Sequence, residues 1–181
     1  MIPRVVFTTF FMLLPASCSS MSCGSDDPRL PVFYTKYTQV LQIPVYDDLG
    51  RPINQIDQVA MKVADHFSNA FPRITRSRLQ NLLEQDPPLV VTMPEPFPCA
   101  GHNDSLGCHY FSGELRMNVI EVFWREDICI AHTSMAHEFI HYFDRMARGR
   151  RDPEHNHPLL WHGPGTVLNQ SNNELARELC E

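Results

Sequence analysis

The N-terminal part of the sequence lacks a hydrophobic run long enough to cross a membrane. A transmembrane helix needs about 20 apolar residues, and the apolar run at residues 5–14 has only ten. This run follows a basic residue, Arg4, and leads into the small residues Ala16 and Ser17. A positive residue, a short apolar stretch and small residues are typical of a secretory signal that is removed on export. The sequence therefore predicts an exported protein.

The small residues before Cys18 resemble the lipoprotein box of bacteria, in which the cysteine is lipidated after cleavage, and Cys23 is a second candidate. We expect residues 1–23 to form this leader, residues 24–31 a polar tether and residues 32–181 the folded domain. The expected location is the bacterial cell envelope, through a lipid on Cys18 or Cys23, or else the periplasm or the extracellular space.

Cysteine pairs of the C-x-x-C kind are also absent, which argues against a zinc site built from cysteines. Four cysteines remain after the two leader cysteines, and four can pair completely. Cys99 and Cys108 bracket a turn-rich loop that a disulfide would close, which leaves Cys129 to pair with Cys180. An exported compartment permits both bonds. We therefore predict two disulfides.

Excess positive charge and internal repeats are absent as well. The chain carries 15 Lys and Arg against 21 Asp and Glu, a formal net charge of −6, which gives no indication of nucleic-acid binding. Arg145, Arg148, Arg150 and Arg151 form a local exception, and we expect them to serve the C-terminal end of a helix. With 43% hydrophobic and 20% charged residues, the sequence predicts one globular domain, expected to be a monomer.

Hydrophobic periodicity and the positions of Pro and Gly predict an α+β domain. The expected strands cover residues 34–45, 89–93, 110–111 and 117–124, and the expected helices cover residues 55–70, 75–85, 133–146 and 171–179.

The helix predicted at residues 133–146 contains a His-Glu-x-x-His motif. His137 and His141 are four residues apart, so a helix places both imidazoles on one face, where they can bind one zinc ion. Glu138 follows the first histidine and can act as a general base on water. Thr133 or Ser134 is expected to cap the helix. The apolar residues that would bury the helix are Met135, Phe139, Ile140, Phe143 and Met146.

A catalytic zinc ion usually takes a third protein ligand and keeps one position for water. The candidates after the motif are His155, His157, His162 and Glu174, and Glu174 lies on the last predicted helix. Their spacing alone does not choose between them. Three further histidines are expected to be structural or surface residues: His66, on a predicted helix, and His102 and His109, which lack a fixed spacing to the motif.

The His-Glu-Phe-Ile-His pentad and the later Asp-Pro-Glu-His-Asn-His-Pro-Leu-Leu-Trp161 resemble the zincin superfamily, most of all its SprT-type and small gluzincin-like branches. The resemblance covers residues 133–162. It implies a zincin-like fold, in which a small mixed sheet packs on the active-site helix together with further helices. It also implies zinc bound by His137, His141 and His157, with Trp161 as the aromatic residue that follows the third histidine.

Several polar residues near the motif are candidates for supporting roles. Asp144, Asp152 or Glu154 could hold a ligand imidazole by a hydrogen bond, although Asp144 could equally face solvent. Tyr142 or His162 could help to stabilise an oxyanion.

The function expected from these residues and from the resemblance is that of a zinc-dependent metallopeptidase. Its cofactor would be Zn²⁺, its substrate a peptide or protein, and Glu138 its general base. The alternative is a zincin-fold envelope lipoprotein that binds zinc, or serves a structural role, without catalysis.

Overall fold

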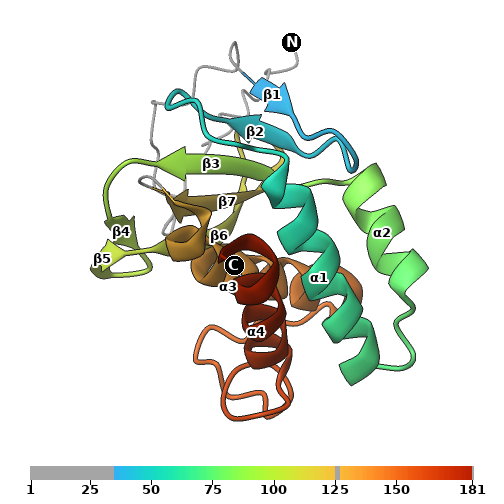
Figure 1. The fold of residues 1–181 in the computed structure, drawn as a ribbon. Coiled ribbons are helices and arrows are strands. Elements are labelled where there is room, and N and C mark those ends of the chain that lie inside the picture. The colour runs from blue at the N-terminus through green and yellow to red at the C-terminus, as the bar shows by residue number, and fades with distance from the viewer. Residues whose placement is uncertain (1–34, 125–126, 181) are drawn as a thin grey trace, which may run out of the picture.

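The computed structural model describes residues 35–124 and 127–180 (Figure 1). The elements in chain order are β1 (Thr35–Tyr37), β2 (Pro44–Tyr46), α1 (Gln55–Ala70), α2 (Arg76–Gln85), β3 (Leu89–Met93), β4 (Phe97–Cys99), β5 (His102–Ser105), β6 (Gly107–Ser112), β7 (Met117–Phe123), α3 (Ile128–Arg148) and α4 (Val167–Cys180). The predicted leader and tether, and with them Cys18 and Cys23, lie outside the described residues.

Five of the strands form one mixed sheet in the order β1-β2-β3-β7-β6. The three inner strands β2, β3 and β7 run parallel, while β1 and β6 pair antiparallel at the two edges. The short strands β4 and β5 form a separate antiparallel pair. The fold is therefore α+β with a small mixed sheet, as the sequence predicts.

The structure differs from the predicted elements in several places. The single strand expected over residues 34–45 is instead the β1–β2 hairpin, and Gln42 between the two strands has a left-handed φ of 52°. The strand expected at residues 110–111 is the middle of the longer β6, and α4 starts before the helix expected at residues 171–179. Strands β4 and β5 were not predicted, because neither shows an apolar alternation.

The helix α3 starts earlier than the motif alone indicates. Asp127 caps it, because its carboxylate accepts a hydrogen bond of 3.0 Å from the backbone N–H two residues later. The prediction that Thr133 or Ser134 caps the helix is therefore wrong. The helix ends at Gly149, whose φ of 65° is a conformation that favours glycine.

The main core lies between the helices and one face of the sheet (Figure 1). Strand β3 shows how the two faces divide: Val90 packs with the helices, whereas Leu89 and Val91 join a small cluster on the opposite face. The largest fully buried side chains of the main core include Trp124, Tyr142, Phe67, Phe139 and Phe143. Three of these five, Phe139, Tyr142 and Phe143, belong to α3, so the helix that carries the motif is also a principal core element.

Both predicted disulfides are confirmed. Cys99 of β4 is bonded to Cys108 of β6, with Cα atoms 5.9 Å apart. Cys129, at the start of α3, is bonded to Cys180 at the end of α4, with Cα atoms 5.5 Å apart. Disulfides of this kind suggest a location outside the cytoplasm. Within residues 35–124 and 127–180, no helix combines the length and the apolar character that spanning a bilayer requires.

A buried carboxylate ties the edge of the sheet to its centre. Asp47, only 3% exposed, accepts hydrogen bonds from the Thr92 hydroxyl and from the backbone N–H of Arg51, both at 2.8 Å. The Lys36 ammonium lies 3.3 Å away. Burial alone would raise the pKa of Asp47, but the bonds from Thr92, Arg51 and Lys36 outweigh it and lower the pKa below its usual range.

We expect Asp47→Asn to lower the free energy of unfolding at pH 7 by about 1–3 kcal/mol, because a buried charge-assisted hydrogen-bond network is weakened. A lowered folded-state pKa stabilises the protein above the unfolded-state pKa of about 3.9, and this stabilisation is lost as the pH falls through the folded-state value. Urea unfolding measures the difference in the free energy of unfolding between the wild type and Asp47→Asn. This difference should be smaller at pH 2.5 than at pH 7. Asp48→Asn, at the exposed neighbour, is the matched control, and an equal loss there would contradict the assignment.

Candidate metal centre

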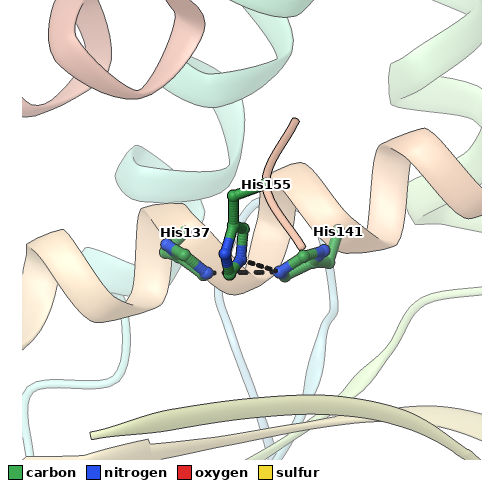
Figure 2. Close-up of side chains that lie close together, drawn as sticks. All are labelled: His137, His141 and His155. Carbon is green, nitrogen blue, oxygen red and sulfur yellow. Dashed lines mark hydrogen bonds between the residues drawn. The ribbon is translucent and has the colours of Figure 1, made fainter. Parts of the chain in front are cut away.

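Three histidines converge beside the middle of α3 (Figure 2). His137 and His141 come from the helix, and His155 comes from the loop that follows it. The Nε2 atom of His141 lies 3.2 Å from Nε2 of His137 and 3.0 Å from Nε2 of His155. A tetrahedral zinc ion, with bonds of about 2.0–2.1 Å to each nitrogen, would hold the nitrogens about 3.3 Å apart. The three histidines could therefore hold a metal ion.

The protonation of these histidines suits metal binding. Burial, followed by the charge of His155, lowers the pKa of His137 to about 4. Burial and the neighbouring imidazoles lower the pKa of His141 to about 3. Burial also lowers the pKa of His155. Because a neutral imidazole has a free nitrogen lone pair, the cluster is in its ligand form at pH 7.

The packing of α3 fixes the first two histidines. Phe139, Ile140 and Phe143, on the other side of the helix, are fully buried in the main core. Rotation of the helix would expose these side chains to water, at a cost of about 1.5–3 kcal/mol for each residue. The imidazoles of His137 and His141 are therefore held one turn apart before any ligand binds.

The third histidine is positioned by a tightly hydrogen-bonded loop. His155 has a φ of 56°, a left-handed conformation that turns the chain back toward α3. The Asp152 carboxylate accepts hydrogen bonds from the backbone N–H of Asn156 at 3.0 Å and of His157 at 2.8 Å. The Trp161 indole N–H donates to the same carboxylate at 2.7 Å. These bonds outweigh burial and lower the pKa of Asp152, which therefore stays ionised.

The buried indole of Trp161 lies against all three histidines. Its ring centroid is 4.8 Å from that of His137, 4.5 Å from that of His141 and 4.6 Å from that of His155. One side chain therefore supports the cluster from the side of the loop while its N–H holds Asp152. Trp161 therefore contacts the cluster, although the resemblance placed it after His157 as the third ligand and the cluster contains His155. Asp152 supports the loop of the third histidine rather than a ring nitrogen.

The other candidates for the third ligand lie elsewhere. The ring of His157 packs against Phe71 at 5.3 Å, and its Nδ1 accepts a hydrogen bond of 3.2 Å from the backbone N–H of Leu159. The cluster therefore contains His155 where the resemblance placed His157. The backbone N–H of His157 binds Asp152, and its ring lies against Phe71, near Arg148 and Asp144 at the end of α3, rather than beside His137 and His141. His162 is exposed, and Glu174 forms ion pairs on α1 with Lys62 and His66.

Glu138 is buried against the edge strand of the sheet. It is 6% exposed, and burial raises its pKa to about 8. A Cβ atom built on Gly107 of β6 would lie 2.6 Å from the Glu138 Oε1 atom, so only glycine leaves room for this carboxylate. Sequence reasoning missed Gly107, although an isolated glycine at a strand end is the signal of a close approach.

Alternate residues of strand β6 contact successive turns of helix α3. After Gly107 and Glu138, the ring of His109 lies 6.2 Å from that of Tyr142, measured between centroids. His109 is therefore part of the wall of the site and not only a loop residue. Tyr142 is fully buried, and its hydroxyl donates at 2.7 Å to the backbone carbonyl of Asp86, so it serves packing rather than the suggested oxyanion role. Asp144 is buried and pairs with Arg148 at 2.6 Å.

We expect His155→Ala to weaken zinc binding by more than about 100-fold, because one of three convergent ligands is lost. His157→Ala, two residues further on, should leave the affinity within a few-fold of the wild type. Competition with a chromophoric zinc chelator, together with elemental analysis, measures both. Loss of zinc with His157→Ala but not with His155→Ala would show that the ligands differ from the cluster described here.

We expect Gly107→Ala to lower the free energy of unfolding by about 1–3 kcal/mol, since its methyl group would overlap Glu138. Gly113→Ala is the matched control, because nothing lies within 4 Å of a Cβ at that position. The cost at Gly107 should shrink when Glu138 is already alanine, and a double-mutant cycle by urea unfolding measures this coupling. Equal costs in both backgrounds would mean that the strain arises from another contact.

The architecture has also been compared with known proteins. Searches against family models, curated proteins and solved structures give no match. The candidate site therefore stands on the chain's own geometry: three imidazoles from two segments, a buried glutamate beside the first of them, and an edge strand that lies against that glutamate.

Proposed function

We propose that this protein is a zinc-dependent metallopeptidase in which His137, His141 and His155 hold the metal and Glu138 is the general base. The observation that carries the proposal is the convergence of the three Nε2 atoms beside a buried glutamate on the same helix. Three protein ligands are typical of catalytic zinc, whereas structural zinc sites usually have four. A purely structural site would also have no use for Glu138.

Zinc, when bound, would supply Lewis-acid chemistry by acidifying water and polarising a carbonyl group. The chain's own contribution is to move a proton. Glu138 would accept it on its carboxylate as water attacks a peptide carbonyl, and would then return it to the departing amine. The pKa of about 8 belongs to the protein without metal. A neighbouring cation favours the carboxylate form, so binding of zinc would lower this pKa and ready Glu138 as a base.

The edge strand supports a peptide as the substrate. Within the described chain, β6 pairs only with β7, so its other side can offer backbone hydrogen bonds to an extended peptide. Gly107 and His109 line this edge next to Glu138. A peptide added to β6 would therefore pass the three histidines.

The proposal includes an exported enzyme that works outside the cytoplasm, as a monomer, with a lipid on Cys18 or Cys23 as the means of membrane attachment. The two disulfides support the compartment. The protein would share a zincin-like architecture with the superfamily that its motif resembles, and the mixed sheet beside the motif helix supports this.

We expect Glu138→Gln to retain one zinc ion while hydrolysis of peptides falls by about 10²–10⁴-fold, because the base is lost and the ligands are not. Glu114→Gln, at an exposed turn, is the control. Zinc content and cleavage of internally quenched peptides are measured on the same preparations. Stoichiometric zinc without hydrolysis in the wild type would favour the alternative of a non-catalytic metal-binding envelope protein.

A further inference from the structure

Arg145 lies near the C-terminal end of β6, the strand that contacts Glu138. Arg145 follows His141 by one helical turn, so it lies on the same side of α3. Its guanidinium carbon is 5.2 Å from the ring centroid of Phe111, the fifth residue of β6. Phe111 itself is 47% exposed. The guanidinium therefore lies at the open edge of the sheet, beside a large apolar surface residue.

Arg151, from the loop that carries His155, extends this positive region. Burial lowers the pKa of Arg145, and the charge of Arg151 lowers it further. Both arginines also lower the pKa of His109, after the larger effect of burial. The charge of each arginine therefore acts on His109, and the charge of Arg151 acts on Arg145.

This positive charge is not neutralised within the described part of the chain, where no carboxylate lies within 4.0 Å of Arg145 or Arg151. The acidic residues next to the two arginines in sequence are otherwise engaged: Asp144 pairs with Arg148, and Asp152 accepts bonds from its own loop. Arg145 and Arg148 both lie in the last turn of α3, where a cation is favoured, as the sequence predicts; of the two, only Arg148 also pairs with a carboxylate. The excess is notable in a chain with a formal net charge of −6.

The distance along β6 sets where a ligand of this pair would lie. Gly107 faces Glu138 and Phe111 faces Arg145, a separation of four strand residues or about 13 Å. An extended peptide beside β6 would thus reach the arginines roughly two to four residues from the bond at the metal cluster. If the peptide pairs antiparallel to β6, these residues precede that bond.

We propose that Arg145 and Arg151 bind an acidic side chain of an extended peptide substrate, two to four residues from the bond that is cleaved. Paired guanidinium groups match a carboxylate in charge and geometry. The exposed ring of Phe111 adds apolar contact for the stem of that side chain. This inference rests on the proposed peptidase function for the cleavage, but the binding of an acidic peptide does not require turnover.

The test uses internally quenched peptides with glutamate at one position at a time, each matched by the same peptide with glutamine. We expect the wild-type protein with zinc to cleave one or two of the glutamate peptides at least about fivefold faster, as kcat/KM, than their glutamine partners. Arg145→Gln and Arg151→Gln should each bring this ratio toward one. Arg150→Gln is the matched control, because it removes the same charge from an exposed neighbour and should keep the ratio.

A second measurement separates this inference from the proposed function. Fluorescently labelled glutamate and glutamine peptides are titrated by anisotropy against the zinc-loaded Glu138→Gln protein. Tighter binding of glutamate peptides that is lost when Arg145→Gln is added, together with a zinc-loaded wild-type protein that cleaves none of the peptides, would uphold the acidic site and refute the peptidase. Cleavage with the same glutamate-to-glutamine ratio of kcat/KM in the wild type and in every variant would overturn the acidic site and leave the peptidase standing. A ratio that falls as much with Arg150→Gln as with Arg145→Gln would do the same.

Discussion

The site depends on one constraint, which is that α3 serves two faces at once. On one side it buries Phe139, Ile140 and Phe143 in the main core, and on another side it presents His137 and His141. The helix phase is fixed by the first set, so the second set has little freedom. A separate scaffold for the two histidines is unnecessary, because the hydrophobic core already orders them.

The buried position of Glu138 has its own cause in the edge strand. Gly107 leaves room for the carboxylate, and the next residue, Cys108, is bonded to Cys99 of β4. The disulfide holds the β4–β5 hairpin onto β6 at the point where the strand meets the helix. The carboxylate is therefore enclosed by a strand with covalent support on one side and a packed helix on the other, and this enclosure raises its pKa.

Local patterns were enough to predict most of the elements and two of the three histidines of the cluster. Histidines four residues apart on an amphipathic helix must lie on the same face of that helix. Four cysteines allow only three pairings, and two of the four bracket one turn-rich loop. The third histidine depends instead on the left-handed φ of His155 and on which N–H groups bind Asp152. Neither is written in residue spacing. The resemblance to a family motif favoured His157 because it could register the order of residues but not the turn between them.

The two sources of ligands differ in how firmly the fold holds them. His137 and His141 belong to a helix that is packed in the main core. His155 is held instead by the hydrogen bonds of its loop to Asp152 and by contact with Trp161. Loops with few buried apolar contacts open more readily than packed helices. A bound metal would join the loop to the helix and so stabilise the closed arrangement by its own binding free energy. Arg151 lies on the same loop as His155. A metal ion that holds this loop against α3 would therefore also restrict the position of Arg151.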